Sequence, residues 1–442
     1  MSEAADSRAR ERILAAAVER IASDGIDDMR IARVAMDARV STSLVHYHFE
    51  TREALLAEAL EYSYELAGDI RIGEAEGEVA GHVERLAGLL DQFLPYPGIL
   101  ERDWILWVEL WLRTVRHPEL RPTAARLYER MRNWLAEAIA AGIEDGAFNG
   151  EADPQRAADR LMALGDGYGV RVLSGGLDIE HARQEIWAGL ASELGLPDKP
   201  PPRQAGRVAS HTRSCPRRPS GVGFLNRYSS YSEGSDAMSP RPRLDHVRRP
   251  ELLEAAAAVI RRRGLENARV ADIAEEAGTS APSVLYYFAT KAELLNEALT
   301  SAEERYYEEL AAGLAGIESA RERLAVIIDS GAGEGDYDSA LWMELWAKAL
   351  RDPELATTRA ELDGRWRRTI AEVVDYGQQR DEFGPADPEE FAVLLGSLLD
   401  GLSVQVALRD VEVTAERVRE LAVALAEREL GCELPAAREP AA

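Results

Sequence analysis

Aromatic side chains end a short helical pattern at two places in this sequence. Tyr47 and Phe49 recur with the same spacing as Tyr286 and Phe288, and two short runs of helical periodicity precede each pair. Two short helices joined by a tight turn form a helix-turn-helix, whose second helix enters the major groove of DNA while flanking residues contact phosphates. The pattern therefore predicts noncovalent recognition of duplex DNA.

Each predicted motif consists of a helix, a turn and a second helix. The three segments cover residues 31–38, 39–40 and 42–48 in the first motif, and residues 270–277, 278–279 and 281–287 in the second. The two second helices, STSLVHYH and SAPSVLYY, differ at most exposed positions. A symmetric palindrome is therefore not the expected target.

Tryptophans form the second group of interest. Trp104, Trp107 and Trp111 are spaced to share one helix face, and Trp342 and Trp346 repeat the last two. We favour a role as core aromatics; the alternative is that they line a cavity for a small-molecule effector. Glu109 and Glu344 fall on another face of an ideal helix, so they give little support to a carboxylate-and-aromatic cage for a cationic effector.

Residue patterns for catalysis or metal binding are missing from the sequence. His46 and His48 are two positions apart and point to different helix faces, so they do not form a ligand pair. Cys215 and Cys432 lie outside any CxxC or Cys/His spacing. The sequence also lacks a nucleophile with a positioned base, a phosphate-binding glycine loop and paired carboxylates. We expect no enzyme activity, no metal and no cofactor.

The elements that must position these residues occur twice. Residues 25–56 align without a gap on residues 264–295, and WVELWLRTVRHPEL recurs as WMELWAKALRDPEL. Apolar residues recur at helical spacing outside one segment rich in Pro, Ser, Gly and Arg, so the predicted fold is all-α with a flexible linker. The predicted parts are two DNA-binding domains (1–56 and 246–295), two C-terminal ligand-binding and dimerisation domains (57–196 and 296–434) and a linker (197–245).

Charge and hydropathy limit the partners. The net charge of −26 repels phosphate, so the predicted DNA contact is local rather than a general coating of nucleic acid. Apolar runs fall short of the ~18 residues of a membrane span, and MSEAADSRARER contains no apolar signal region. We expect a soluble, cytoplasmic protein that does not bind membranes.

The repeated stretches ARVSTSLVHYHFETREALL and AGTSAPSVLYYFATKAELL resemble the DNA-binding domain of TetR-family transcriptional regulators. In that domain a turn of the type AGVS precedes a recognition helix, which ends in an aromatic-His/Tyr-Phe triplet followed by a basic residue and a Leu-Leu pair. The downstream halves resemble the ligand-binding domain of the betaine-responsive BetI-type subgroup, through WMELWAKALRDPEL and LLDGLSVQVAL. The resemblance covers both halves of the chain and excludes only the linker and the extreme termini.

The resemblance implies operator DNA and an unidentified small-molecule effector as partners. Tyr47 and Arg52, like Tyr286 and Lys291, match phosphate-contacting positions, and residues of the two second helices lie near base edges. The full set of predicted DNA-binding residues is Arg30, Thr42, Ser43, Leu44, His46, Tyr47, His48, Arg52, Arg269, Ala281, Pro282, Ser283, Leu285, Tyr286, Tyr287 and Lys291. The effector pocket is predicted at Trp104, Trp107, Trp111, Trp342 and Trp346.

The family also implies a dimer interface of four helices, here at about residues 157–173 and 389–408, which carry Asp166-Gly167 and Asp400-Gly401. A flexible linker of about 50 residues reaches roughly 40 Å, so the two units are expected to pair within one chain. The predicted protein is a monomer with an internal pseudodimer, although higher assembly is not excluded. It is expected to repress transcription from an asymmetric operator and to be released by effector.

Three departures from the family pattern leave an alternative open. Arg39 stands where the turn usually has glycine, as Gly278 does in the second motif, and Arg30 and Arg269 stand where a capping threonine is common. Pro282 falls in the first turn of its helix, where proline is tolerated. Together with the acidic charge, Arg39 is compatible with a ligand-sensing or protein-interaction module that has lost DNA binding in one half or both.

Overall fold

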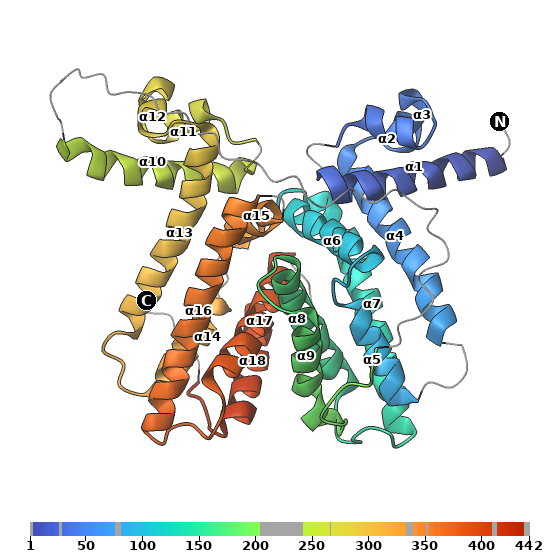
Figure 1. Ribbon diagram of the computed structural model, residues 1–442, viewed down its shortest axis with the longest axis vertical. Helices are drawn as coiled ribbons and strands as arrows, with labels where there is room; N and C mark the ends of the chain where they lie inside the picture. The colour runs from blue at the N-terminus through green and yellow to red at the C-terminus, as the bar shows by residue number, and fades with distance from the viewer. Residues whose placement is uncertain are drawn as a thin grey trace, which may run out of the picture.

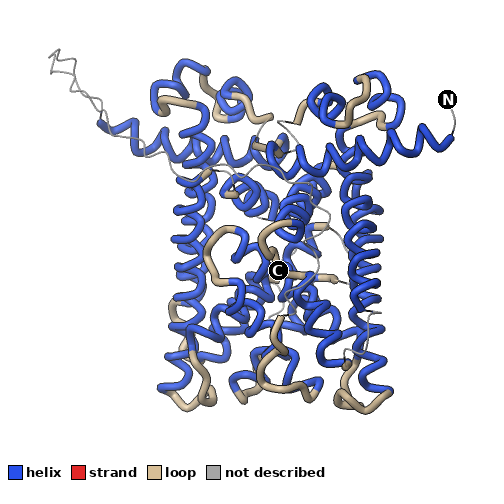
Figure 2. Tube along the Cα trace, turned by 45° about the vertical axis from the view of Figure 1, so that its right-hand side comes forward, coloured by secondary structure: helices blue, strands red, loops and turns tan. Residues whose placement is uncertain are grey.

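The computed structural model is helical throughout its described part, and Figure 2 draws no strand among those residues. The structure describes residues 3–25, 29–75, 81–203, 242–265, 267–332, 339–350, 352–408 and 413–436. Most of the predicted linker, with Cys215, lies outside these residues. The all-α fold predicted from the sequence is confirmed.

The first unit begins with a three-helix head and continues into a helical bundle (Figure 1). Its head consists of α1 (Glu3–Asp24), α2 (Ile31–Asp37) and α3 (Thr42–His48). Its bundle consists of α4 (Arg52–Ala75), α5 (His82–Gln92), α6 (Ile99–Arg116), the short 3₁₀ helix η1 (Pro118–Leu120), α7 (Arg121–Glu144), α8 (Pro154–Leu173) and α9 (Ile179–Leu194).

The second unit repeats this order. Its head consists of α10 (Pro242–Arg263), α11 (Val270–Glu276) and α12 (Ala281–Tyr287). Its bundle consists of α13 (Lys291–Leu314), α14 (Ala320–Gly331), α15 (Ser339–Ala349), α16 (Pro353–Gln379), α17 (Pro388–Ala407) and α18 (Ala415–Leu430). Each head is joined to its bundle by one continuous helix, α4 or α13, which runs through the predicted domain boundary.

The same local signals start the equivalent helices of both units. Asp153 before α8 and Asp387 before α17 each accept hydrogen bonds from two backbone N–H groups of the first turn, and a proline occupies the first helical position. These side chains satisfy N–H groups that have no partner within the helix. Gly195 and Gly431 end α9 and α18 in the left-handed conformation, with φ of 67° and 58°. The same capping residues therefore set the starts of α8 and α17 and the ends of α9 and α18.

The two units pack side by side through α8, α9, α17 and α18 (Figure 1). The crossing of α8 over α17 is close because glycines lie at the contact. A Cβ on Gly167 would overlap the backbone carbonyl of Ser397, and a Cβ on Gly401 would overlap that of Ala163. The two predicted Asp-Gly pairs therefore lie at the centre of the contact between the units.

A second contact joins α6 to α15 beneath the heads. Both heads lie at the same end of the molecule, and the four-helix contact extends to the opposite end (Figure 1). Helix α17 is long and apolar enough to cross a membrane, but 72% of its apolar window is buried inside the protein. That burial is typical of a core helix.

The first residues of the predicted linker pack against the first unit. The indole N–H of Trp187 donates to the carbonyl of Pro197 at 2.7 Å, and Arg183 donates to the carbonyl of Pro201 at 2.8 Å. The guanidinium of Arg203 lies 3.6 Å from the ring centre of Tyr96. This beginning of the linker is therefore part of the folded first unit rather than a free tether.

Candidate nucleic-acid interface and effector cavity

The recognition helix of the first head starts at a serine cap. The Oγ of Ser41 accepts a hydrogen bond from the backbone N–H of Leu44 at 3.2 Å, and Val45 is buried beneath the helix. The outward face carries the predicted contact residues Thr42, Ser43, His46 and Tyr47. Leu44 is half-buried. Tyr47 is 73% exposed, which is unusual for a large aromatic side chain and leaves its hydroxyl accessible to a ligand.

The second head repeats the arrangement with different side chains. The Oγ of Ser280 accepts from the N–H of Ser283 at 3.4 Å, and Val284 occupies the buried position. Pro282, Ser283, Leu285 and Tyr286 face outward, and Ala281 is half-buried. Tyr286 is 79% exposed. Both heads therefore present one exposed tyrosine near the end of a short capped helix.

Basic residues frame both helices. Arg52 and Lys291, at the starts of α4 and α13, are exposed, as are Arg30 and Arg269 just before α2 and α11. Neither Arg30 nor Arg269 caps its helix through the side chain. These four cations surround recognition helices in a chain whose total charge is −26. Positive charge is therefore available locally where a phosphate backbone would pass.

Two predicted contact residues point away from this surface. The side chain of His48 is 8% exposed, and its Nε2 lies 3.5 Å from a carboxyl oxygen of Asp6 in α1. Tyr287 is half-buried, and its ring meets that of Tyr286 edge-on at 5.2 Å. Both side chains pack within their heads rather than on the outward face of the recognition helix.

The turn of the first motif tolerates its arginine. Arg39 has a φ of 55° and Gly278 has a φ of 60°, so both turns use the left-handed region. A residue with a Cβ pays a conformational cost there of roughly 1 kcal/mol. The helices on both sides of Arg39 nevertheless have the same limits as those of the second motif, so the substitution does not alter the geometry of the motif.

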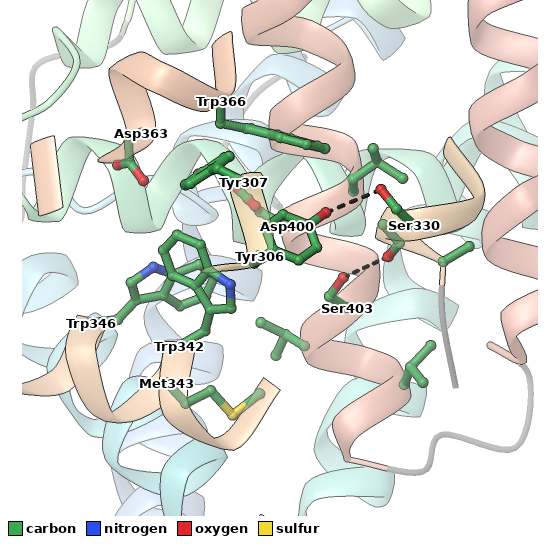
Figure 3. Close-up of a pocket in the computed structure, with 15 residues that line it drawn as sticks. Tyr306, Tyr307, Ser330, Trp342, Met343, Trp346, Asp363, Trp366, Asp400 and Ser403 are labelled. Atoms are coloured by element: carbon green, nitrogen blue, oxygen red, sulfur yellow. Dashed lines mark hydrogen bonds between the residues drawn. The ribbon is translucent and has the colours of Figure 1, made fainter. Parts of the chain in front are cut away.

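The second unit contains a cavity of about 230 Å³ between α13, α14, α15, α16 and α17 (Figure 3). Five aromatic residues, two aspartates and two serines are among the residues that line it. The main lining residues are Tyr306, Tyr307, Ser330, Trp342, Trp346, Asp363, Trp366, Asp400 and Ser403. Trp342 and Trp346 come from the predicted set, whereas the other seven were not predicted.

Each carboxyl group that lines this cavity pairs with an arginine side chain. Asp400 accepts a hydrogen bond from Arg171 of the first unit at 2.7 Å, and Asp363 lies 3.4 Å from Arg359. Arg359 is fully buried and stacks 5.0 Å from the ring centre of Trp346. Burial raises the pKa of Asp400, and the adjacent Arg171 opposes that shift. Arg171 connects this cavity directly to the other unit.

The aligned region of the first unit is nearly filled. Trp104, Trp107 and Trp111 all line a space of about 40 Å³, together with Phe93 and Asp166 among others. Trp104 and Trp111 pack edge-on with ring centres 5.8 Å apart. Trp111 is 1% exposed, as expected of a core aromatic. The predicted tryptophans therefore surround cavities of very different size in the two units.

Asp166 corresponds to Asp400 but has neutral partners. Its carboxyl group accepts hydrogen bonds from the Tyr128 hydroxyl at 3.0 Å and from the Gln405 amide of the second unit at 3.3 Å. Burial raises the pKa of Asp166 to about 7, although both hydrogen bonds favour the charged form. Near neutral pH this carboxyl group is therefore close to half protonated.

The helix that carries Trp342 and Trp346 also contacts its own head. The buried Glu344 accepts a hydrogen bond from the backbone N–H of Leu265 at 3.0 Å, in the segment that connects α10 to α11. Glu344 is absent from the cavity lining, as its place on another helix face predicts. One helix thus links the cavity to the head.

A mixed cluster lies at the edge of the contact between the units. His181 and Glu185 of α9 and Glu390 of α17 bring three possible ligand atoms within 4.8 Å of one another. His181 Nε2 is 3.6 Å from a carboxyl oxygen of Glu390, which is sufficient for an ion pair. The expected absence of a metal stays a prediction.

Comparisons with known proteins match both units. The model described as "Bacterial regulatory proteins, tetR family" matches residues 13–59 and 252–298, and "BetI-type transcriptional repressor, C-terminal" matches residues 82–195 and 320–431. Regulator BetI of Cronobacter sakazakii is 27% identical over 209 residues, which are 45% of this chain and 99% of that protein. BetI of Stenotrophomonas maltophilia is 28% identical over 188 residues, which are 41% of this chain and 93% of that protein.

Among solved structures, a transcriptional regulator from Saccharomonospora viridis in complex with choline is 30% identical, with a TM-score of 0.40. It matches over 42% of this chain and 98% of its own chain. Each relative thus corresponds to about half of the sequence, whereas the family models match twice. The chain belongs to the TetR family of bacterial transcriptional regulators, as a tandem of two units with BetI-type C-terminal halves.

Proposed function

We propose that the chain is a transcriptional repressor, without enzyme activity and cytoplasmic, whose two heads bind two non-identical half-sites of one operator. The observation that carries the proposal is the pair of capped recognition helices at one end of the molecule, with Tyr47 and Tyr286 exposed (Figure 1). In helix-turn-helix dimers the half-sites are one helical turn, roughly 34 to 36 Å, apart. Because the exposed residues of the two helices differ, the half-sites differ too.

We further propose that one chain provides both halves of the dimer. The glycine-lined crossing of α8 over α17 and the bond from Arg171 to Asp400 supply within one chain the contact that separate subunits supply in a dimer. A tether raises the effective concentration of one unit at the other to roughly millimolar. The functional species is then a monomer with one chain per operator.

Selection of bound sequences from random duplex DNA tests the DNA-binding proposal. We expect enriched sites with two unlike half-sites, and light scattering after size exclusion is expected to give the mass of one chain, free and on DNA. Enrichment of a perfect palindrome, or a two-chain species that persists on dilution, would contradict the proposal. Absence of enrichment would favour the ligand-sensing module without DNA binding.

The effector that best fits the second unit's cavity is a small organic cation. The faces of Trp342, Trp346 and Trp366 are electron-rich, and electron-rich rings attract cations. Arg359 already makes this contact with one face of Trp346. Asp363 and Asp400 place carboxylate oxygens at the wall, each paired on its other side with a buried arginine. A cation without N–H groups would be bound by rings and carboxylates and would leave no donor unsatisfied.

We propose that the effector signal passes through α15. A ligand against Trp342 and Trp346 displaces the helix that also holds Leu265 of the head through Glu344. Release from DNA requires that the effector bind more tightly to the arrangement of the heads that does not fit the operator. By the same linkage, operator DNA weakens effector binding.

Choline and its neutral isostere 3,3-dimethylbutan-1-ol test the effector proposal. We expect choline to bind at least tenfold more tightly, because only choline carries charge, and to release operator DNA. Trp342→Ala is expected to weaken release while leaving DNA affinity without effector unchanged, and the aligned Trp107→Ala serves as the matched control. Equal binding of the two probes would contradict the cationic class, and a parallel loss of stability and DNA affinity in Trp342→Ala would identify Trp342 as a core residue.

A further inference from the structure

The effector cavity of the second unit has a counterpart in the first unit that is blocked at two positions. In the first unit the indole of Trp104 lies directly over Gly169, because a Cβ on Gly169 would overlap its six-membered ring. The repeat aligns Trp104 with Ser339 and Gly169 with Ser403. Ser403 lines the open cavity of the second unit. The larger residue and the glycine that accommodates it both occur in the first unit.

A phenylalanine packed on a glycine is the second feature that fills the corresponding space of the first unit. Phe93 ends α5 and packs on Gly165, where a Cβ would lie 3.2 Å from the Phe93 Cβ. The repeat aligns Phe93 with Gly331 and Gly165 with Leu399. Gly331 lies against Leu399 and lines the open cavity. The first unit therefore has a phenyl ring where the second unit has no side chain.

Most aromatic lining residues of the second unit have no aromatic residue at the aligned sequence position of the first unit. Four lining residues of the second unit have no like residue at the aligned position. Tyr306, Tyr307, Asp363 and Trp366 align with Ala67, Gly68, Tyr128 and Met131, respectively. Of the five aromatic lining residues, only Trp342 and Trp346 are retained, as Trp107 and Trp111. Trp107 packs edge-on against Tyr128 of the same unit, with ring centres 5.4 Å apart. The first of the two retained tryptophans therefore already contacts an aromatic side chain of its own unit.

We infer that effector sensing is one-sided: within the described residues, the cavity beside the tryptophan-bearing helix is open in the second unit, and Trp104 and Phe93 fill the corresponding space of the first unit. This inference rests on the effector part of the proposed function. One chain then binds one effector molecule, and saturation follows a single-site curve without cooperativity. The first unit is held permanently in one arrangement by its own side chains and responds only through its contact with the second unit.

Xenon tests the cavities independently of the effector's identity. Apolar cavities of roughly 150 Å³ bind xenon, whereas well-packed cores do not. Crystals of the full chain under xenon pressure are expected to show xenon beside Trp342 and Trp366 and none beside Trp107. The variant Trp104→Ser, which gives the first unit the second unit's residue, is expected to admit xenon there. Xenon in both cavities of the unaltered protein would overturn the inference.

Calorimetric titration with choline tests the stoichiometry. We expect one choline per chain, at least tenfold weaker binding in Trp366→Met and unchanged binding in Trp104→Ser, with thermal melting as the check on folding. Two equivalent choline sites would overturn the inference, as would loss of binding in a folded Trp104→Ser. Xenon confined to the second unit without any choline binding would preserve the one-sided cavity and refute the cationic effector.

Discussion

The two units place different hydrogen-bond partners around an aspartate that they share at aligned positions. Asp400 of the second unit faces a guanidinium at 2.7 Å, whereas the aligned Asp166 of the first unit faces a hydroxyl and an amide. Both lie beside a glycine at the crossing of α8 and α17, and both line the cavity of their own unit. Both units therefore contribute the same backbone arrangement to the crossing, while the polar groups around their two aspartates differ.

This difference shows which parts of a duplicated fold can change independently. The crossing requires a glycine from each unit, so neither unit can alter it alone. The cavity is lined by residues of the second unit alone, so its size can change without a change in the glycines of the crossing. The two units accordingly keep the same helix limits in the heads and the same close crossing, and they differ in the cavity and in the exposed residues of the recognition helices.

The largest expected effect comes from neutralising the two carboxyl groups separately. Asp400→Asn leaves the buried Arg171 without its ion-pair partner, so we expect unfolding free energy to fall by about 3 to 5 kcal/mol. Asp166→Asn keeps an oxygen that accepts the same two hydrogen bonds, so we expect a loss below about 1 kcal/mol near neutral pH. Urea denaturation measures both. Equal losses would mean that the two carboxyl groups have equivalent surroundings.

The pH dependence of stability sharpens the same comparison. The pKa of Asp166 is raised from 3.8 to about 7, so the folded protein retains a proton that the unfolded chain has lost. Its contribution to stability is complete below about pH 4 and is lost as pH rises to about 7, at up to ~1.4 kcal/mol per pH unit. Unfolding curves of Asp166→Asn, subtracted from those of the unaltered protein, measure this term. A difference independent of pH would rule it out.

A methyl group at the crossing is expected to have the next largest effect. In Gly401→Ala the new Cβ meets the carbonyl of Ala163, so α8 and α17 must separate, at a cost of roughly 1 to 3 kcal/mol. DNA affinity is expected to fall as well, because the heads change their spacing. Gly88→Ala in α5 is the control, since nothing lies within 4 Å of its Cβ and alanine favours helix by ~1 kcal/mol. Similar melting temperatures for both variants would contradict the close crossing.

The heads are expected to act independently. Tyr47→Ala with Arg52→Ala is expected to weaken one half-site footprint, and Tyr286→Ala with Lys291→Ala the other. Each lost phosphate contact lowers the slope of log K against log salt by about 1. Footprinting over a salt series measures both effects. Loss of both footprints in either folded variant would argue against independent reading by the two heads.

The smallest effect concerns the two turns. Arg39→Gly removes a side chain from a left-handed position, so we expect a gain of up to about 1 kcal/mol. The reverse change, Gly278→Arg, is expected to cost a similar amount because Gly278 has nearly the same φ. Thermal melting of both variants provides the measurement. A destabilising Arg39→Gly would indicate that the arginine side chain makes a contact that outweighs the strain.

The head motifs could be read from the sequence because their determinants are local. Ser41, for example, caps α3, and Val45 is the buried residue of the same helix, so both signals lie within five consecutive positions. The helix limits at Thr42–His48 and Ala281–Tyr287 agree with the prediction. The resemblance to the family implied that the helices carrying the Asp-Gly pairs meet, and α8 and α17 do cross there. These features depend on spacing along one helix, which a sequence displays directly.

Most of the cavity could not be read in this way. Tyr306, Asp363 and Asp400 come from three helices that are distant in the sequence, and only the packing of the bundle brings them together. The repeat does not mark these positions either, since Tyr306 and Asp363 align with unlike residues in the first unit. The sequence signal for such a cavity is a difference between two otherwise similar units. Tyr306 and Tyr307, which align with Ala67 and Gly68, are an example.

The unlike exposed faces of the two recognition helices have a consequence for orientation on the chromosome. His46 lies outward on one helix, and Leu285, 49% exposed, lies at the aligned position on the other. A dimer of identical subunits on a palindrome looks the same from either end. If one chain binds one operator through both heads, as proposed, it docks in one direction only, and the cavity of the second unit faces the same flank of the operator each time. Such a repressor has polarity and can distinguish upstream from downstream.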